Sequence, residues 1–159
     1  AQLVDLYPTT LAAVGRPLPA DVHLHGRNLL DVIENPQGAT RDYALAGQFG
    51  HSVTITDGEW VLHQAPVEGN QPLFWYGHCL AKFQHYELGP FENGRRAVDH
   101  TPWPTPTWLS HKTDDPNELT NLAGERPDKL REMQRALKRT LADRQAPAEQ
   151  IERLGLTGA

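Results

Sequence analysis

Cysteine is nearly absent from this chain, which has 159 residues and a single cysteine, Cys79. One thiol cannot form an internal disulfide, and zinc sites built from several thiolates are excluded for the same reason. No apolar run approaches the roughly 20 residues of a membrane-spanning helix. The glycine-rich loops that bind nucleotide phosphates and the serine elbow of the α/β-hydrolases are also missing. Considered residue by residue, the sequence therefore predicts no catalytic group and no metal ligand.

Positive charge is scarce too, with 15 Lys and Arg against 20 Asp and Glu and a net charge of −5. Nucleic-acid phosphates and anionic lipids repel such a chain, so we expect no nucleic acid and no membrane as partner. Apolar residues make up 38% of the chain, and the mean hydropathy of −0.57 allows one domain with a modest core. The first residue is not methionine, and we expect either a removed leader or a longer parent protein.

Two helical segments are predicted near the start of the chain. In "VDLYPTTLAAVG", Asp5 is placed to cap a helix and Gly15 to end it. Four apolar residues recur there at helical spacing and predict one buried face: Leu6, Tyr7, Leu11 and Val14. "GRNLLDVIENP" is a second short helical or turn segment, closed by Pro36.

The strands follow. "SVTITDGEWVLH" predicts a β-hairpin around Asp57 and Gly58, a pair that two-residue turns favour. Residues 72–76 and 107–111 are a third and a fourth predicted strand. Between them, 77–106 is rich in proline and glycine and is interpreted as a long irregular excursion, a kind of segment that is usually functional or disordered.

The last element is a predicted helix over 127–143. Pro127 suits a helix start, and four apolar residues repeat at helical spacing: Leu130, Met133, Leu137 and Leu141. This helix should lie on one face of the strands, and its basic residues are interpreted as its solvated face: Arg131, Arg135, Lys138 and Arg139. The predicted fold class is α+β, a small antiparallel sheet of about four strands packed against a C-terminal helix.

Few side chains stand out as functional candidates. The acidic stretch "TDDPNE" lacks the ligand spacing of a calcium loop, so we predict a turn there. His23 and His25 share a face only if their segment is extended. His51 and His63 bracket the hairpin next to loops and are the favoured histidines. Cys79 is interpreted as a buried small hydrophobe rather than as a nucleophile with a histidine base, for which the two candidates are His78 and His85.

The acidic stretch also carries a family resemblance. "KTDDPNELTNLA" resembles the D-P-x-E-x-x-N-L-A segment near the C-terminus of the sulfatases. "LVDLYPTTLAAVGRPLP", "HGRNLL" and "TDGEWVL" are similar to other sulfatase segments and occur in the family's order. The four motifs cover most of 2–141, with 77–106 unmatched. Before the turn, the family often has an acidic residue in the sequence L-Y-D-L, whereas this chain has "WLSHKT" and lacks it.

Sulfatases hydrolyse sulfate esters or sulfamates with a formylglycine made in a C/S-x-P-x-R motif, beside calcium or a similar divalent ion. Cys79 lacks the proline and arginine of that motif, and the D-H-G metal-ligand segment is missing. In the family both precede the V-D-L-x-P-T segment. The resemblance therefore implies a C-terminal portion that holds no nucleophile, metal ligand or cofactor, with calcium or another divalent metal in the parent enzyme.

The same resemblance implies a division of the chain and its partner. Residues 1–40 would belong to the edge of the large α/β domain, and 41–159 would be the C-terminal subdomain docked on it. Loops of this subdomain reach the rim of the family's cleft, which makes His51, His63 and 77–106 candidates for substrate contact. The expected partner is the catalytic N-terminal domain, and without it the N-terminal helix should expose an apolar face that a homo-oligomer could cover.

Two rival interpretations remain open. One is a free-standing binding or interaction module derived from a sulfatase. The other is the tail of a related metal-dependent phosphodiesterase or phosphonate hydrolase. The sequence predicts neither the substrate nor the cellular compartment.

Overall fold

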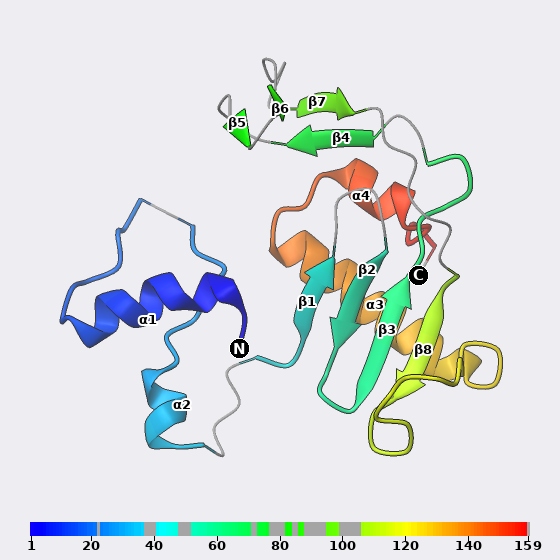
Figure 1. Cartoon of the computed structure of the whole chain (residues 1–159), viewed down its shortest axis with the longest axis horizontal. Coiled ribbons are helices and arrows are strands. Elements are labelled where there is room, and N and C mark those ends of the chain that lie inside the picture. Colours follow the sequence, from blue (N-terminus) through cyan, green and yellow to red (C-terminus); the bar gives the residue numbers. More distant parts are fainter. Residues whose placement is uncertain are drawn as a thin grey trace.

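The computed structural model describes residues 1–21, 23–36, 41–47, 52–70, 73–76, 82–83, 86–87, 95–98 and 106–158. Figure 1 shows an N-terminal helical part lying beside the β1 edge of a sheet, with two further helices behind that sheet. The helical part begins with a 3-10 turn, Leu3–Asp5, followed by α1 (Leu6–Ala13) and α2 (Leu30–Glu34). Both predicted N-terminal helices are therefore confirmed.

The start of α1 differs from the prediction. Asp5 occupies the cap position but makes no side-chain capping bond. Its carboxylate instead accepts the backbone N–H groups of Gln2 and Arg27 and pairs with Arg41. Burying a carboxylate without such partners would cost more free energy than leaving the helix end without a side-chain cap. The predicted end is confirmed, because Gly15 follows α1 with a φ of +66° and its N–H bonds to the carbonyl of Ala12.

Much of the apolar surface of the N-terminal part faces solvent. The prediction of a buried face is wrong for Leu6, Tyr7 and Val14, which are all exposed. The exposed large apolar side chains of this part are Leu3, Val4, Leu6, Tyr7, Val14, Leu18 and Ile33. The alternative expectation, an apolar face left uncovered in the isolated chain, is confirmed.

The main sheet has four antiparallel strands in the order β1-β2-β3-β8: Ala44–Gly47, Val53–Thr56, Trp60–Gln64 and Trp108–His111. The predicted α+β class with a four-stranded antiparallel sheet is confirmed. The strand predicted over 72–76 exists as β4 (Leu73–Tyr76) but pairs with β7 (Arg95–Val98) in a separate sheet. The place in the main sheet belongs to β1, which the short run "ALAG" did not suggest.

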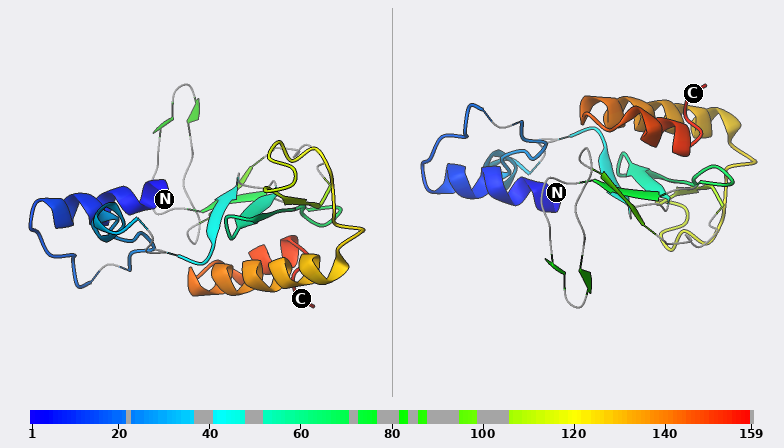
Figure 2. Two further views of the ribbon diagram at one scale, coloured as in Figure 1. Left: turned by 90° about the horizontal axis from the view of Figure 1, so that it is seen from below. Right: turned by 90° about the horizontal axis from the view of Figure 1, so that it is seen from above.

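The excursion over 77–106 is not wholly irregular. Besides β7 it contains β5 (Lys82–Phe83) and β6 (Tyr86–Glu87), which form an antiparallel pair. This pair lies away from the main sheet, on the side opposite to α3 (Figure 2). Apart from Pro106, the rest of the excursion lies outside the described residues.

The hairpin between β2 and β3 is confirmed, but its turn is longer than two residues. Thr56 and Val61 are the last partners in register, so four residues separate them. The Asp57 carboxylate accepts the N–H groups of Glu59 and Trp60 at 3.0 and 2.7 Å. This Asx-type bonding holds the wider turn, with Gly58 at a φ of +100°.

The core lies between the sheet and its helices. α3 (Pro127–Asp143) crosses one face, as predicted, and α4 (Ala148–Arg153) follows it (Figure 2). Alternation along the strands points one side-chain set toward α3. The buried apolar cluster consists of Ile55, Leu62, Leu109, Met133, Ala136, Leu137, Leu141, Leu154 and Leu156. Because none of the described residues of the N-terminal part belongs to this cluster, the sheet and its helices form a core of their own.

Candidate functional site

His63 lies on the sheet face opposite to α3, because its strand neighbour Leu62 points into the core. Its Nδ1 is 2.7 Å from the Thr54 hydroxyl on β2, and its Nε2 is 3.0 Å from the Glu118 carboxylate. The side chains of His63 and Glu118 are 37% and 26% exposed. Solvent and ligands can therefore reach this group.

The Glu118 carboxylate is tuned by its neighbours. The hydrogen bond with His63 lowers the pKa of Glu118 most strongly; burial opposes it, and the charges of His63 and Lys112 lower it further. Both ring nitrogens of His63 already have protein partners. A ligand would have to displace Thr54 or Glu118 to bind the imidazole. His51, the other favoured histidine, lies outside the described residues, as do Cys79 and its candidate bases.

The acidic stretch forms the predicted turn. The N–H groups of Asp114 and Asp115 both bond to the carbonyl of His111, and the Asp115 carboxylate accepts the N–H of Thr120 at 2.7 Å. Asn121 then ties the segment to β8, because its Oδ1 accepts the N–H of Leu109 at 3.1 Å. The residues that carry the sulfatase resemblance thus act here as a structural turn. Across the described parts of the chain, no three His, Cys, Asp or Glu side chains are grouped to hold a metal ion.

The side chain of His111, the last residue of β8, contacts two acidic side chains. His111 lies on the sheet face that packs against α3, the face opposite to His63. Its Nε2 and Nδ1 are each 2.7 Å from a carboxylate oxygen, of Glu59 and Asp114 respectively. Its ring also lies 4.5 Å from the ring of Trp60. The hydrogen bonds to Glu59 and then Asp114 raise the pKa of His111 above its ordinary value.

This cluster predicts a pH dependence of stability. A histidine whose pKa is raised by folding stabilises the fold fully below the ordinary value of 6.5 and loses that contribution as pH rises through the raised value. We therefore expect the urea midpoint to fall as pH rises above 6.5. His111→Gln should flatten the slope. Equal slopes in His111→Gln and the parent chain would contradict the assignment.

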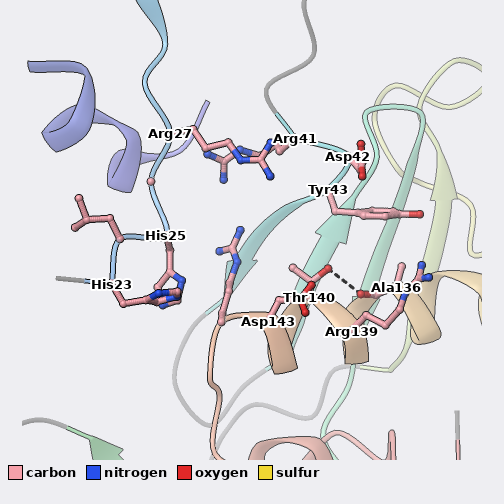
Figure 3. Close-up of a pocket in the computed structure, with 13 residues that line it drawn as sticks. His23, His25, Arg27, Arg41, Asp42, Tyr43, Ala136, Arg139, Thr140 and Asp143 are labelled. Atoms are coloured by element: carbon pink, nitrogen blue, oxygen red, sulfur yellow. Dashed lines mark hydrogen bonds between the residues drawn. The ribbon is translucent and has the colours of Figure 1, made fainter. Parts of the chain in front are cut away.

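A second candidate site is a pocket of about 510 Å³ between the N-terminal part and the last turns of α3 (Figure 3). We call it the basic pocket after its six basic lining residues, which are His23, His25, Arg27, Arg41, Arg139 and Arg144. Figure 3 shows the two histidines on one side and the α3 side chains on the other. Asp42 and Asp143 supply the acidic groups of the lining.

The segment that carries the histidines is extended and held close to the chain start. The rings of His23 and His25 lie 4.7 Å apart at 81°, so the two side chains share a face. A Cβ built on Gly26 would lie only 1.9 Å from the carbonyl oxygen of Val4. Only glycine allows this close backbone approach, which places His25 and Arg27 at the pocket.

Arg41 joins the pocket to the N-terminal part. Its side chain is 9% exposed and pairs with Asp5, whose side chain is fully buried. Burial raises the pKa of Asp5, but the N–H groups of Arg27 and Gln2 and the charge of Arg41 outweigh it and leave that pKa lowered. A second arginine, Arg144, donates to the Gln2 side chain at 3.1 Å. This network holds the start of the chain against the sheet and α3.

The pocket's positive charges crowd one another. Burial lowers the pKa of Arg144, and the charge of Arg41 lowers it further; Asp5 opposes this, and Arg27 adds to the lowering. Burial also lowers the pKa of His25, as do the nearby charges of His23 and Arg144. Arginine stays protonated in proteins, so the pocket keeps its guanidinium charges at neutral pH.

The basic pocket was not predicted from the sequence. Arg139 was expected on the solvated face of the last helix, and His23 and His25 had no predicted partner. The pocket unites segments that are far apart in the chain, so no local spacing reveals it. The only signal was the run "HLHGR", three basic side chains at alternating positions in a chain short of positive charge.

Comparison with solved structures finds a similar chain fold in a Bacteroides thetaiotaomicron sulfatase (BT33336S-sulf), from work on that organism's metabolism of multiple glycosaminoglycans. The two chains are 18% identical and superpose with a TM-score of 0.52, over 86% of this chain and 24% of the other. No protein-family model and no curated protein matches the chain. In the described residues no helix is long and apolar enough to cross a membrane. The chain thus shares its fold with about a quarter of a sulfatase.

Proposed function

We propose that this chain is the C-terminal portion of a sulfatase-type sulfuric ester hydrolase and is inactive alone. The observation that carries the proposal is the fold similarity to a sulfatase over 86% of this chain and 24% of the other. The four sequence motifs support it independently, because they follow the order of the sulfatase segments that they resemble. The nucleophile and a calcium or similar divalent ion would belong to the parent enzyme's preceding domain.

The exposed apolar surface of α1 supports a missing partner domain. Leu6 in α1 and its neighbours Leu3 and Val14 are each more than half exposed. Surface of this kind usually marks a contact with another protein part. The proposed partner is the catalytic N-terminal domain, which would cover α1. In its absence, self-association through α1 would bury the same residues.

The role proposed for the sheet is to shape the substrate cleft. His63 is half-exposed on the face opposite to α3, beside Thr54 and Glu118. Hydroxyl, imidazole and carboxylate groups can each bond a sugar hydroxyl. By analogy with the family, His51, His63 and the 77–106 excursion would contact the alcohol or amine half of a sulfated substrate.

The proposal predicts the size and activity of the native protein. An immunoblot of source cells with antibody against this chain should detect a band several times larger than 17.8 kDa. Protein captured by that antibody should release 4-nitrophenol from 4-nitrophenyl sulfate, and pre-immune serum should capture no activity. The purified 159-residue chain should show no turnover with any added divalent metal.

Other outcomes favour the rival functions. A native band at 17.8 kDa would sink the proposal and favour the free-standing binding module. A large band whose captured activity cleaves bis(4-nitrophenyl) phosphate but not the sulfate ester would identify the related phosphodiesterase. Turnover by the purified short chain, surviving repurification, would refute the claim that the catalytic groups lie elsewhere.

A further inference from the structure

We infer that the basic pocket binds a small polar molecule that carries at least two oxyanionic groups, such as sulfate, phosphate or carboxylate. This inference goes beyond the proposed function and does not depend on it. It rests on the charge, the hydrogen-bonding state and the size of the pocket, which are separate observations.

The charge of the pocket is unusual for this chain. Four guanidinium groups and two carboxylates line it, a surplus of two positive charges (4 − 2) in a protein of net charge −5. Asp5 lies behind Arg41 and offsets one of them. Two imidazoles add N–H donors to the same wall. Converging positive groups of this kind focus an attractive field on an anion.

The guanidinium groups are also available for bonding. Within the described residues, the side chains of Arg27 and Arg139 make no ion pair, and Arg144 bonds only to the neutral Gln2 amide. Asp42 and Asp143 line the same pocket, yet neither pairs with these arginines. Arg41 is already paired with Asp5. An oxyanion is the acceptor that arginine suits best, so the unpaired guanidinium groups of Arg27 and Arg139 favour an anionic ligand.

The size of the pocket limits the ligand. A volume of about 510 Å³ lies in the range of small-molecule sites, roughly 300–1,000 Å³, and leaves room for more than one oxyanion. The wall is mostly polar, with Tyr43 and Thr140 as neutral hydrogen-bonding groups. A polar molecule with two linked anionic groups therefore fits better than an apolar one or a lone sulfate or phosphate ion.

Calorimetric titration of the full chain with two probes tests the inference. The probes are sodium pyrophosphate and a disaccharide with two sulfate groups, and the unsulfated disaccharide serves as the reference ligand. We expect at least one probe to bind and the unsulfated sugar not to bind. The tighter probe would show whether the anionic groups come from an inorganic ion or from a sugar.

Substitutions locate the binding. Arg139→Gln removes an exposed pocket charge and should weaken binding about tenfold or more, as loss of a charged hydrogen bond does. Arg144→Gln should do the same from the inner wall. Arg131→Gln is the matched control, since it removes the same charge from α3 outside the pocket and should change the Kd less than about twofold. The inference is overturned if neither probe binds, or if Arg131→Gln weakens binding as much as Arg139→Gln.

Discussion

Asp5→Ala is expected to detach the N-terminal part from the sheet while the sheet and α3 stay folded. The Asp5 carboxylate accepts the N–H groups of Gln2 and Arg27 at 2.6 and 2.9 Å and pairs with Arg41. Its removal leaves Arg41 largely buried without its counter-charge. Breaking a buried pair in this way typically costs about 3–5 kcal/mol. An eight-residue helix such as α1 cannot hold its structure alone against that loss.

Amide hydrogen exchange measures this effect locally. Protection of residues 1–36 should drop by roughly a hundredfold or more in Asp5→Ala, because each 1.4 kcal/mol corresponds to about tenfold. Protection in β3 should be retained, since no N-terminal residue that the structure describes belongs to the core. Asp21→Ala, an exposed position of the same part, is the matched control and should change neither region. Unchanged protection of residues 1–36 in Asp5→Ala would show that the Asp5–Arg41 pair does not anchor them.

Leu62→Ala should destabilise the sheet and its helices by about 2–5 kcal/mol. Leu62 is fully buried in β3 and pairs in register with Ile55 on one side and Leu109 on the other. All three side chains point toward α3, so truncation leaves a cavity at the centre of the cluster. Urea unfolding followed by circular dichroism gives the change in free energy.

Two further variants keep this prediction testable if Leu62→Ala does not fold. Ile55→Val removes one methyl group from the same cluster and should cost about 0.5–1.5 kcal/mol. Leu119→Ala changes a leucine that is 76% exposed and should stay within about 0.5 kcal/mol of the parent chain. A loss in Leu119→Ala equal to that in Ile55→Val would contradict the placement of the core.

Elements with strong local patterns were predictable from the sequence. The spacing of Met133, Leu137 and Leu141 predicted α3, and these residues are buried against the sheet. Alternation and Asp57-Gly58 predicted the hairpin. β1 was missed because "ALAG" carries neither β-branched residues nor aromatics, and it is a strand only because β2 offers a partner. α4 was not predicted because it has no buried residue of its own, and the core contacts of this region come from the two leucines that follow it, Leu154 and Leu156.

For the candidate sites, the sequence indicated single residues but not the partners that the fold brings to them. His63 was singled out for its place beside a loop, but its partners Thr54 and Glu118 come from other segments. Nothing near Asp5 in the sequence indicates Arg41, so the sequence suggested a helix cap where the structure has a buried ion pair. The basic pocket depends on the packing of three segments, and its arginines look like ordinary surface residues when each is considered alone.

The sequence by itself determined the α+β class, the hairpin, the C-terminal helix and the sulfatase-like motifs. Each of these depends on residues that lie close together in the chain. The tertiary structure alone decided which strand completes the main sheet, which carboxylate anchors the N-terminal part and where the arginines converge. Those outcomes depend on burial and on charges brought together across the chain. Local spacing cannot encode them, since the cost of burying a charge is set by the partner that the fold supplies.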